Sequence, residues 1–309
     1  MNKLILNFKS KDTKKIKNAK NFLGGKGANL SEMGRMGLPV PPGFTISTNV
    51  CEIFYKDKKK LNNKLIGQIK KELKIIEKDV SKKFGDLKNP LLLSVRSGAR
   101  VSMPGMMDTI LNLGLNDKTV IALANKTSNG RFAKDSYRRF IQMYGNVVMG
   151  VESYHFEELI ENYKLTKGVL LDTDLDEKDW EGLISDFKKV IKTQTNKTFP
   201  QNVFDQLLGA ISAVFLSWES NRAKVYRKLN QIPGEWGTAV NVQSMVFGNM
   251  GDDCATGVVF TRNPSDGENE VYGEYLINAQ GEDVVSGTRT PQYITKKGRE
   301  TVDSKNSSM

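Results

Sequence analysis

Two basic residues of this chain stand beside glycine-rich segments, and both have the chemistry to bind phosphate. Lys26 lies in residues 24–27 (GGKG), directly before a helical pattern that places Leu30 and Met33 on one face. Free backbone N–H groups, the positive end of a helix and an ammonium group can together hold one phosphate. The G-x-x-x-x-G-K-[ST] spacing of a Walker loop is absent. The alternative is a plain tight turn before a helix.

Arg96 ends residues 91–96 (LLLSVR), an apolar run whose alternation predicts a strand. A second arginine, Arg100, follows, and then residues 103–107 (MPGMM), where Gly105 permits backbone conformations that other residues resist. A guanidinium at a strand end above a glycine loop is suited to polyphosphate. An arginine that is solvated or paired with a surface carboxylate would give the same pattern.

The elements that must position these residues indicate a mixed α/β fold. Short strands are predicted at residues 4–8 and 40–47, and residues 118–197 show helical periods only. From residue 238 onward the pattern is β again, which predicts an antiparallel sheet. The sequence therefore predicts a helical subdomain inserted into an α/β chain. His155, the only histidine, falls in this helical part, where we expect it to cap or pack a helix.

Composition limits the function classes. The 309 residues are 39% hydrophobic and 26% charged, which is typical of a globular protein with one large or two modest domains. The net charge of +11 favours anionic partners, but no basic patch with interleaved aromatic residues occurs, so we expect no nucleic-acid binding. No apolar run approaches the roughly 20 residues of a membrane helix. We therefore expect a cytoplasmic protein with no membrane contact.

Six segments, taken together, resemble the N-terminal nucleotide-binding part of the pyruvate, phosphate dikinase family. The resemblance covers residues 1–292 in colinear order. Phosphoenolpyruvate synthase and the glucan dikinases share the Ser-Val-Arg-Ser strand, but in the family pattern a different loop follows it, whereas MPGMMD points to the pyruvate, phosphate enzyme. The segments are GGKGANLSEM, SVRSGARVSMPGMMDTILNLGLND, DSYRRFIQMYGNVVM, GEWGTAVNVQSMVFGN, GVVFTRNP and GEYLINAQGEDVV.

The resemblance implies an ATP-grasp fold of the α/β (α+β) class, in which two lobes hold ATP between them. The last grasp strands of the family pattern have no counterpart in this sequence. The implied division is a first lobe of residues 1–115 with 200–240, a helical insertion of residues 116–199, an incomplete second lobe of residues 241–295, and a disordered tail of residues 296–309.

The resemblance also implies roles for particular residues. Lys26 and Arg96 match the lysine and arginine of the family that contact polyphosphate and serve catalysis. Gly105 falls in its flexible glycine loop over the γ-phosphate, and Arg139 matches an arginine linked to phosphate use. The remaining matches are Gln243, Met245 and Val246 beside adenine, and Glu282 and Asp283 near the triphosphate.

The implied reaction converts ATP, phosphate and pyruvate to AMP, diphosphate and phosphoenolpyruvate and uses Mg²⁺. In the family, a histidine on a separate swivelling domain carries the phosphoryl group, and a C-terminal barrel receives it for pyruvate. The resemblance also implies a homodimer. The family's magnesium ligands, its Gln-x-Arg pair and its Thr-Ser-His segment have no match here, so we expect pyruvate and phosphoenolpyruvate to be handled by domains absent from this sequence. Three hypotheses stay open: the ATP-binding part of a dikinase that makes no phosphoenolpyruvate alone, a catalytically inactive nucleotide-binding module, or a non-functional truncated remnant.

Overall fold

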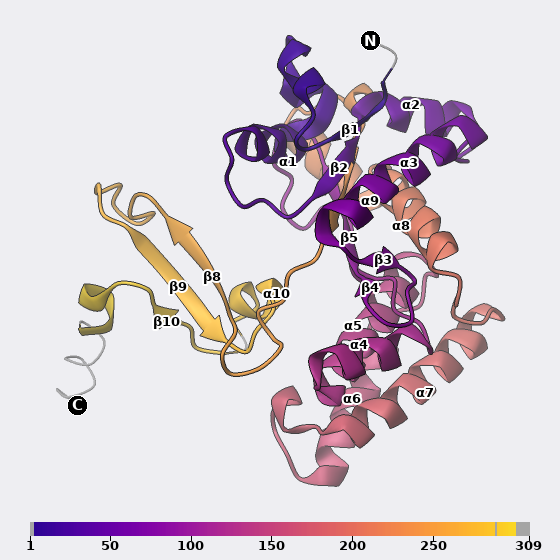
Figure 1. Ribbon diagram of the computed structural model, residues 1–309, viewed down its shortest axis with the longest axis vertical. Helices are drawn as coiled ribbons and strands as arrows, with labels where there is room; N and C mark the ends of the chain where they lie inside the picture. The colour runs from indigo at the N-terminus through magenta and orange to yellow at the C-terminus, as the bar shows by residue number, and fades with distance from the viewer. Residues whose placement is uncertain (1–2, 288, 301–309) are drawn as a thin grey trace. The chain divides into compact units, whose positions relative to one another are not determined.

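A computed structural model describes residues 3–287 and 289–300 of the chain (Figure 1). The chain divides into two compact units, with the boundary between Met245 and Val246. Helices and antiparallel sheets occur together, so the α+β class expected from the sequence is confirmed.

The first unit is organised on a five-stranded sheet with the order β1-β2-β7-β5-β6. Every neighbouring pair in this sheet is antiparallel. Strand β7 pairs with β2 on one side and β5 on the other, so a late segment closes a sheet begun near the N-terminus. The strands are β1 (Ile5–Asn7), β2 (Gly43–Ile46), β5 (Leu93–Gly98), β6 (Thr109–Leu113) and β7 (Ala239–Ser244).

Helix α1 (Ala19–Arg35) lies on the sheet, in contact with β2, β5 and β7. Its small residues allow this contact, because a Cβ at Gly27 would lie 2.6 Å from the Thr45 hydroxyl oxygen. Leu6 of β1 packs with Leu23 and Ala28 of α1 in a buried cluster. The apolar face of α1 therefore fixes the helix on the strands that precede and follow it.

Other helices pack around the same sheet. Helices α2 (Thr48–Lys56) and α8 (Val203–Ser217) contact each other through Phe54 and Phe215, whose ring centroids are 5.3 Å apart, and both helices contact β7. Helix α3 (Asn63–Val80) contacts β1 and β2. The smaller elements of this unit are η1 (Lys11–Lys15), α9 (Asn221–Leu229), η3 (Gly234–Trp236) and the parallel pair β3 (Lys83–Phe84) and β4 (Pro90–Leu91).

Between β6 and α8, where every residue is described, the chain forms helices and no strand. Figure 1 shows these helices together at one end of the first unit. They are α4 (Thr119–Thr127), α5 (Gly130–Val147), α6 (Tyr154–Lys167), η2 (Asp172–Asp174) and α7 (Glu177–Thr195). Phe156 and Phe187 contribute to their core, with ring centroids 4.9 Å apart. The helices belong to the same compact unit as the five-stranded sheet.

The second unit contains a three-stranded antiparallel sheet with the order β10-β9-β8. Its elements are β8 (Ala255–Phe260), β9 (Tyr272–Ile277), α10 (Gly281–Val285) and β10 (Gln292–Tyr293). We expected a second lobe from residue 241, but β7 belongs to the larger sheet, so the boundary falls after Met245. Of the expected tail, residues 296–300 are helical, and residues 301–309 lie outside the described residues.

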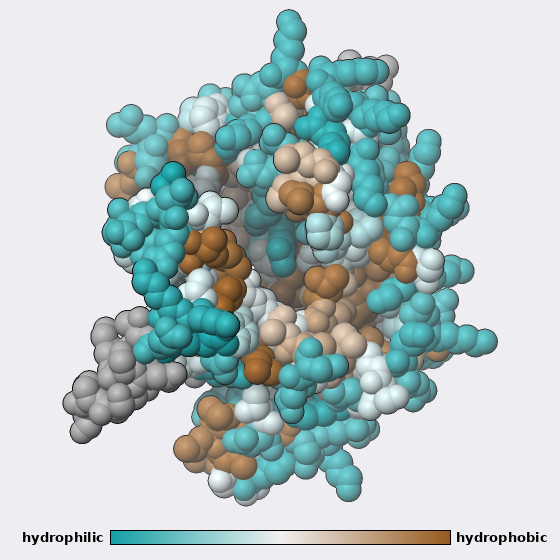
Figure 2. All heavy atoms as spheres, turned by 60° about the vertical axis from the view of Figure 1, so that its left-hand side comes forward, coloured by the Kyte–Doolittle hydropathy of each residue, from teal (hydrophilic) through white to brown (hydrophobic). Residues whose placement is uncertain are grey.

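Hydrophilic side chains cover most of the face shown in Figure 2, with smaller hydrophobic patches between them. Within residues 3–287 and 289–300, no helix combines the length and the apolar character that a membrane span requires.

Gly24 is the position at which α1 meets β5 most closely. Its φ of 70° and ψ of 169° are not helical, so α1 bends there and a regular helix continues from Gly25. A Cβ at Gly24 would lie 1.8 Å from the carbonyl oxygen of Gly98. The Gly25 amide donates a hydrogen bond of 2.8 Å to the Ala99 carbonyl. Only glycine therefore permits both the bend and the close approach.

We expect Gly24→Ala to lower the free energy of unfolding by about 3 kcal/mol, because it combines overpacking with a positive-φ backbone conformation that essentially only glycine adopts. Gly37→Ala is the matched control, since Gly37 has a φ of 82° but nothing within 4 Å of an added Cβ. That control reports the cost of a positive φ without a close contact, at about 1 kcal/mol. Urea denaturation of both variants measures the difference. Equal losses would contradict the importance of the close approach.

Candidate functional site

A pocket of about 870 Å³ opens where α1 faces the end of β5 and the connection to β6. We call it the Lys26 pocket. It is lined by α1 residues Lys20, Gly25, Lys26, Asn29, Leu30 and Met33, and by Ser97, Gly98, Ala99, Arg100, Val101, Ser102, Met103, Pro104, Gly105, Met107 and Thr109. Two of the predicted site residues, Lys26 and Gly105, therefore lie in one pocket.

Lys26 stands in the first turn of α1 after the bend at Gly24. Backbone N–H groups at such a helix start lack intrahelical partners and carry a partial positive charge. Lys26 is solvent-exposed, although the concave pocket replaces part of the bulk water around its ammonium group. This desolvation lowers the pKa of Lys26, and the positive charge of Arg96 lowers it further. The lysine and the arginine are thus close enough to repel each other.

Arg96 reaches this region from β5, where it is half-buried. It pairs in register with Asn241 of β7 and Thr109 of β6, and residues paired in this way point to the same face of a sheet. Gly27 of α1 approaches Asn241 on that face. Arg96 does not line the Lys26 pocket itself, but the next two residues of its strand do.

The loop between β5 and β6 is anchored on both flanks of Gly105. Met103 is buried with Trp218 in a cluster against which Met106 and Met107 pack. The carboxylate of Asp108 accepts a hydrogen bond from the Arg222 guanidinium. At Gly105, φ is 70° and an added Cβ would meet nothing within 4 Å. The loop therefore combines fixed ends with an open, left-handed turn at the pocket.

Arg139, which the sequence linked to phosphate use, lies on α5 and does not line the Lys26 pocket. Its Nε donates to the Asp135 carboxylate at 3.2 Å. Arg138 donates to the same carboxylate at 2.5 Å. Burial of Asp135 alone would raise the pKa of its carboxyl group, but the positive charges of Arg138 and Arg139 outweigh this effect and hold the pKa below its usual value. The structure thus places Arg139 in an ion network within the helical part, and its phosphate role stays a prediction.

Gln243 lies near the C-terminal end of β7 and Met245 directly after it, beside the start of β5 and thus at the other end of that strand from the Gly105 loop. The Gln243 side-chain amide donates to the Pro41 carbonyl at 3.0 Å, and the Met245 sulfur accepts a hydrogen bond of 3.0 Å from the Asn112 amide. Neither residue lines the Lys26 pocket. Their contact with adenine stays a prediction.

Val246, Glu282 and Asp283 belong to the second unit. Val246 is 75% exposed directly after the boundary. Asp283 caps α10, because its carboxylate accepts a hydrogen bond of 2.8 Å from the Gln280 amide. Capping does not exclude a second role for a carboxylate, so the triphosphate contacts of Glu282 and Asp283 also stay predictions.

The sequence patterns did not single out Asn241. It is 1% exposed, and its side-chain oxygen accepts a hydrogen bond of 2.7 Å from the Thr45 hydroxyl. Its amide nitrogen has no hydrogen-bond partner among the residues described. The pairing of β7 with β5 brings this buried donor beside Arg96, and no local pattern in the sequence carries that information.

The Lys26 pocket suits an anion better than a metal ion. Its lining, as far as the chain is described, contains no carboxylate. Across residues 3–287 and 289–300, no group of three or more His, Cys, Asp or Glu side chains is arranged to hold a metal ion. Lys26, Arg100 and the backbone amides of the helix start can neutralise and bind phosphate oxygens. A Mg²⁺ ion at this pocket would depend on phosphate oxygens and water for its ligands.

Comparisons with known proteins agree with this chemistry. The family model for the pyruvate phosphate dikinase AMP/ATP-binding domain matches residues 20–67 and 59–308. Pyruvate, phosphate dikinase of Clostridium symbiosum is 59% identical over 278 residues, which are 90% of this chain and 32% of that protein. The enzymes of Rhizobium meliloti and Entamoeba histolytica are 57% and 54% identical, and the match again covers 90% of this chain and 31% and 32% of those proteins.

The chain thus spans about a third of the length of the curated relatives that it matches. The resemblance found in the sequence motifs is confirmed by a family model that covers nearly all of the chain and by relatives that share more than half of their aligned residues with it. This protein therefore belongs to the family of the pyruvate phosphate dikinase AMP/ATP-binding domain.

Proposed function

We propose that the Lys26 pocket binds the polyphosphate of ATP as the nucleotide site of a pyruvate, phosphate dikinase. One observation carries the proposal: α1 and β5, which are distant in the sequence, bring Lys26 and Arg96 close enough that one charge lowers the pKa of the other. Two cations held together are unfavourable until an anion neutralises them. A polyphosphate would convert this repulsion into attraction to both groups.

The chemistry of phosphoryl transfer fits these residues. The protein contributes mainly positioning and charge neutralisation, because the reaction demands little covalent chemistry from it. Lys26 would supply a compact charge, and the Arg96 guanidinium would offer a planar fork for two phosphate oxygens. The Gly105 turn would allow its loop to approach the terminal phosphate without a side chain in the way. Mg²⁺ would enter with ATP and help to neutralise the phosphates.

The proposal extends to the whole protein of which this chain forms a part. The relatives are named pyruvate, phosphate dikinases. On that ground, we assign to the whole protein the conversion of ATP, phosphate and pyruvate to AMP, diphosphate and phosphoenolpyruvate, in a cytoplasmic homodimer. This chain would provide the nucleotide half of the reaction, and other domains would carry the phosphohistidine and the pyruvate site.

An ATP-grasp arrangement is part of the same proposal. The five-stranded sheet and the three-stranded sheet would form its two lobes, with the helical part of residues 116–199 as an insertion. Adenine would contact the segment that contains Gln243, Met245 and Val246. Glu282 and Asp283 would act near the triphosphate, and Arg139 would assist phosphate use. The support for these assignments is the match to the family's motifs.

We expect Lys26→Ala and Arg96→Ala each to weaken ATP binding by about tenfold or more. Each variant removes a hydrogen bond between charged groups, which contributes about 1.5–3 kcal/mol. Isothermal titration with ATP and Mg²⁺ measures the change. Lys74→Ala is the control, because Lys74 is an exposed residue of α3 that does not line the pocket. Unchanged affinity in both site variants would refute the proposal, and binding without turnover would favour an inactive nucleotide-binding module.

The affinity for ATP should fall at alkaline pH. The free-state pKa of Lys26 lies below its ordinary value of 10.5, and bound phosphate would raise it again. The ammonium contribution to binding is therefore complete below the lowered pKa of the free state and is lost as the pH rises from there through the raised pKa of the bound state. Binding should take up protons at pH values between the lowered pKa of free Lys26 and its raised pKa in the complex. Calorimetric titration in buffers of different ionisation enthalpy measures this proton uptake. Lys26→Arg stays charged and should abolish this uptake, whereas persistent uptake would assign the effect to another group.

A further inference from the structure

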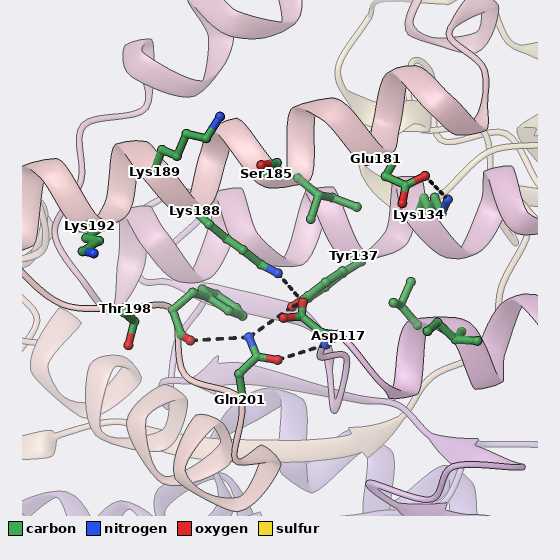
Figure 3. A pocket seen from close by; sticks show the side chains of 14 residues that line it. Asp117, Lys134, Tyr137, Glu181, Ser185, Lys188, Lys189, Lys192, Thr198 and Gln201 are labelled. Carbon is green, nitrogen blue, oxygen red and sulfur yellow. Dashed lines mark hydrogen bonds and ion pairs between the residues drawn. The ribbon is translucent and has the colours of Figure 1, made fainter.

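A second cavity, of about 700 Å³, lies among the helices between β6 and α8 (Figure 3). Helices α4, α5 and α7 form its walls together with the segment before α8. We call it the α4–α7 cavity. None of its lining residues also lines the Lys26 pocket. The nucleotide proposal therefore leaves this cavity without a role.

The floor of the α4–α7 cavity is apolar. Val120 and Ile121 line it from α4, Ile184 from α7, and Phe199 from the segment before α8. Phe199 packs edge-on against the ring of Tyr137, with centroids 6.2 Å apart. Ile121 is 60% exposed, so this floor is open to a ligand. Concave sites of this size with an apolar floor and a few fixed polar groups are typical of small-molecule binding.

A polar network fixes one side of the cavity. The Tyr137 hydroxyl donates a hydrogen bond of 2.8 Å to Asp117, and the Lys188 ammonium donates to the same carboxylate. The backbone amide of Asp117 donates to the side chain of Gln201 at 3.0 Å. Figure 3 shows Tyr137 and Lys188 converging on Asp117. The ammonium group of Lys188 also lies 5.1 Å from the centroid of the Tyr137 ring, so its position is set before any ligand binds.

The lysines around the cavity are only partly neutralised. Lys134 pairs with Glu177 at 3.1 Å and with Glu181 at 2.8 Å. Lys189 pairs with Asp186 at 2.9 Å. The side chain of Lys192, by contrast, forms no ion pair or hydrogen bond with any described part of the chain.

Lys192 stands one helical turn beyond Lys188, so the two side chains start from the same face of α7. Both residues line the cavity. Lys188 forms an ion pair with the carboxylate of Asp117, whereas Lys192 has no ion-pair partner among the described residues. The cavity therefore has an apolar floor and, beside it at Lys192, one ammonium group without an ion-pair partner in the part of the chain that the structure describes.

We propose that the α4–α7 cavity binds a small amphipathic organic anion. An aromatic or branched apolar body would lie on Val120, Ile121 and Ile184, and a phosphate or carboxylate head would lie between Lys188 and Lys192. An inorganic anion would leave the apolar floor in contact with water, and a neutral apolar molecule would leave Lys192 without a counter-charge. Recognition therefore requires both parts in one molecule.

Methyl NMR of the chain labelled at isoleucine tests the proposal, because Ile121 and Ile184 report from the cavity itself. Phenyl phosphate and benzoate are the probes for the two head groups, with benzyl alcohol and inorganic phosphate as the incomplete probes. We expect saturable shifts of both methyl signals with at least one complete probe and about tenfold weaker binding of the incomplete ones. The buried Ile5 and Ile46 of the central sheet should not shift.

Lys188→Met and Lys192→Met test the head-group site, since methionine keeps an apolar stem without the charge. We expect the double variant to bind the complete probe about tenfold more weakly. Lys178→Met is the matched control, because Lys178 is an exposed residue of α7 outside the cavity. Isoleucine spectra of the free variants show whether the fold is kept. Absence of saturable shifts, equal binding of benzyl alcohol, or full affinity in a folded double variant would overturn the proposal.

Discussion

The contact between the bend of α1 and the end of β5 is the constraint on which the Lys26 pocket depends. Gly24 leaves room for the Gly98 carbonyl, and the Gly25 amide bonds to Ala99. After this contact the regular helix begins at Gly25, so that a helix N-terminus and Lys26 lie beside the strand that carries Arg96. The pocket therefore results from a backbone packing requirement, and its charge follows from the residues that this packing brings together.

The loop between β5 and β6 forms the other wall of the Lys26 pocket, and its ends and its tip differ in packing. Methionines on both sides of Gly105 pack near Trp218, and the ion pair of Asp108 with Arg222 holds the end of the loop. The Gly105 turn itself is unobstructed. The loop is thus packed at its two ends and open at its tip, and the open tip lines the Lys26 pocket.

The sequence predicted the local features of this site and missed its long-range features. Alternation identified the strand that ends at Arg96, and glycine spacing identified the helix start at Lys26. Neither pattern shows that β7 lies between β2 and β5. Because of this pairing, the boundary between the two units lies after Met245 and not at the predicted residue 241, and Asn241 lies beside Arg96. Strand order depends on contacts between distant segments, whereas periodicity records only which face of an element is buried.

The two cavities of the first unit use positive charge in different ways. In the Lys26 pocket, Lys20, Lys26 and Arg100 belong to a described lining without carboxylates, so an anion with more than one charge suits the site. In the α4–α7 cavity, the carboxylates of Asp117, Glu177, Glu181 and Asp186 equal the four lysines in number, and Lys192 is the lysine without an ion-pair partner among the described residues. Because a polyanion gains most where fixed cations lack counter-charges, it should prefer the first site, whereas a ligand with one anionic group and a large apolar surface should prefer the second.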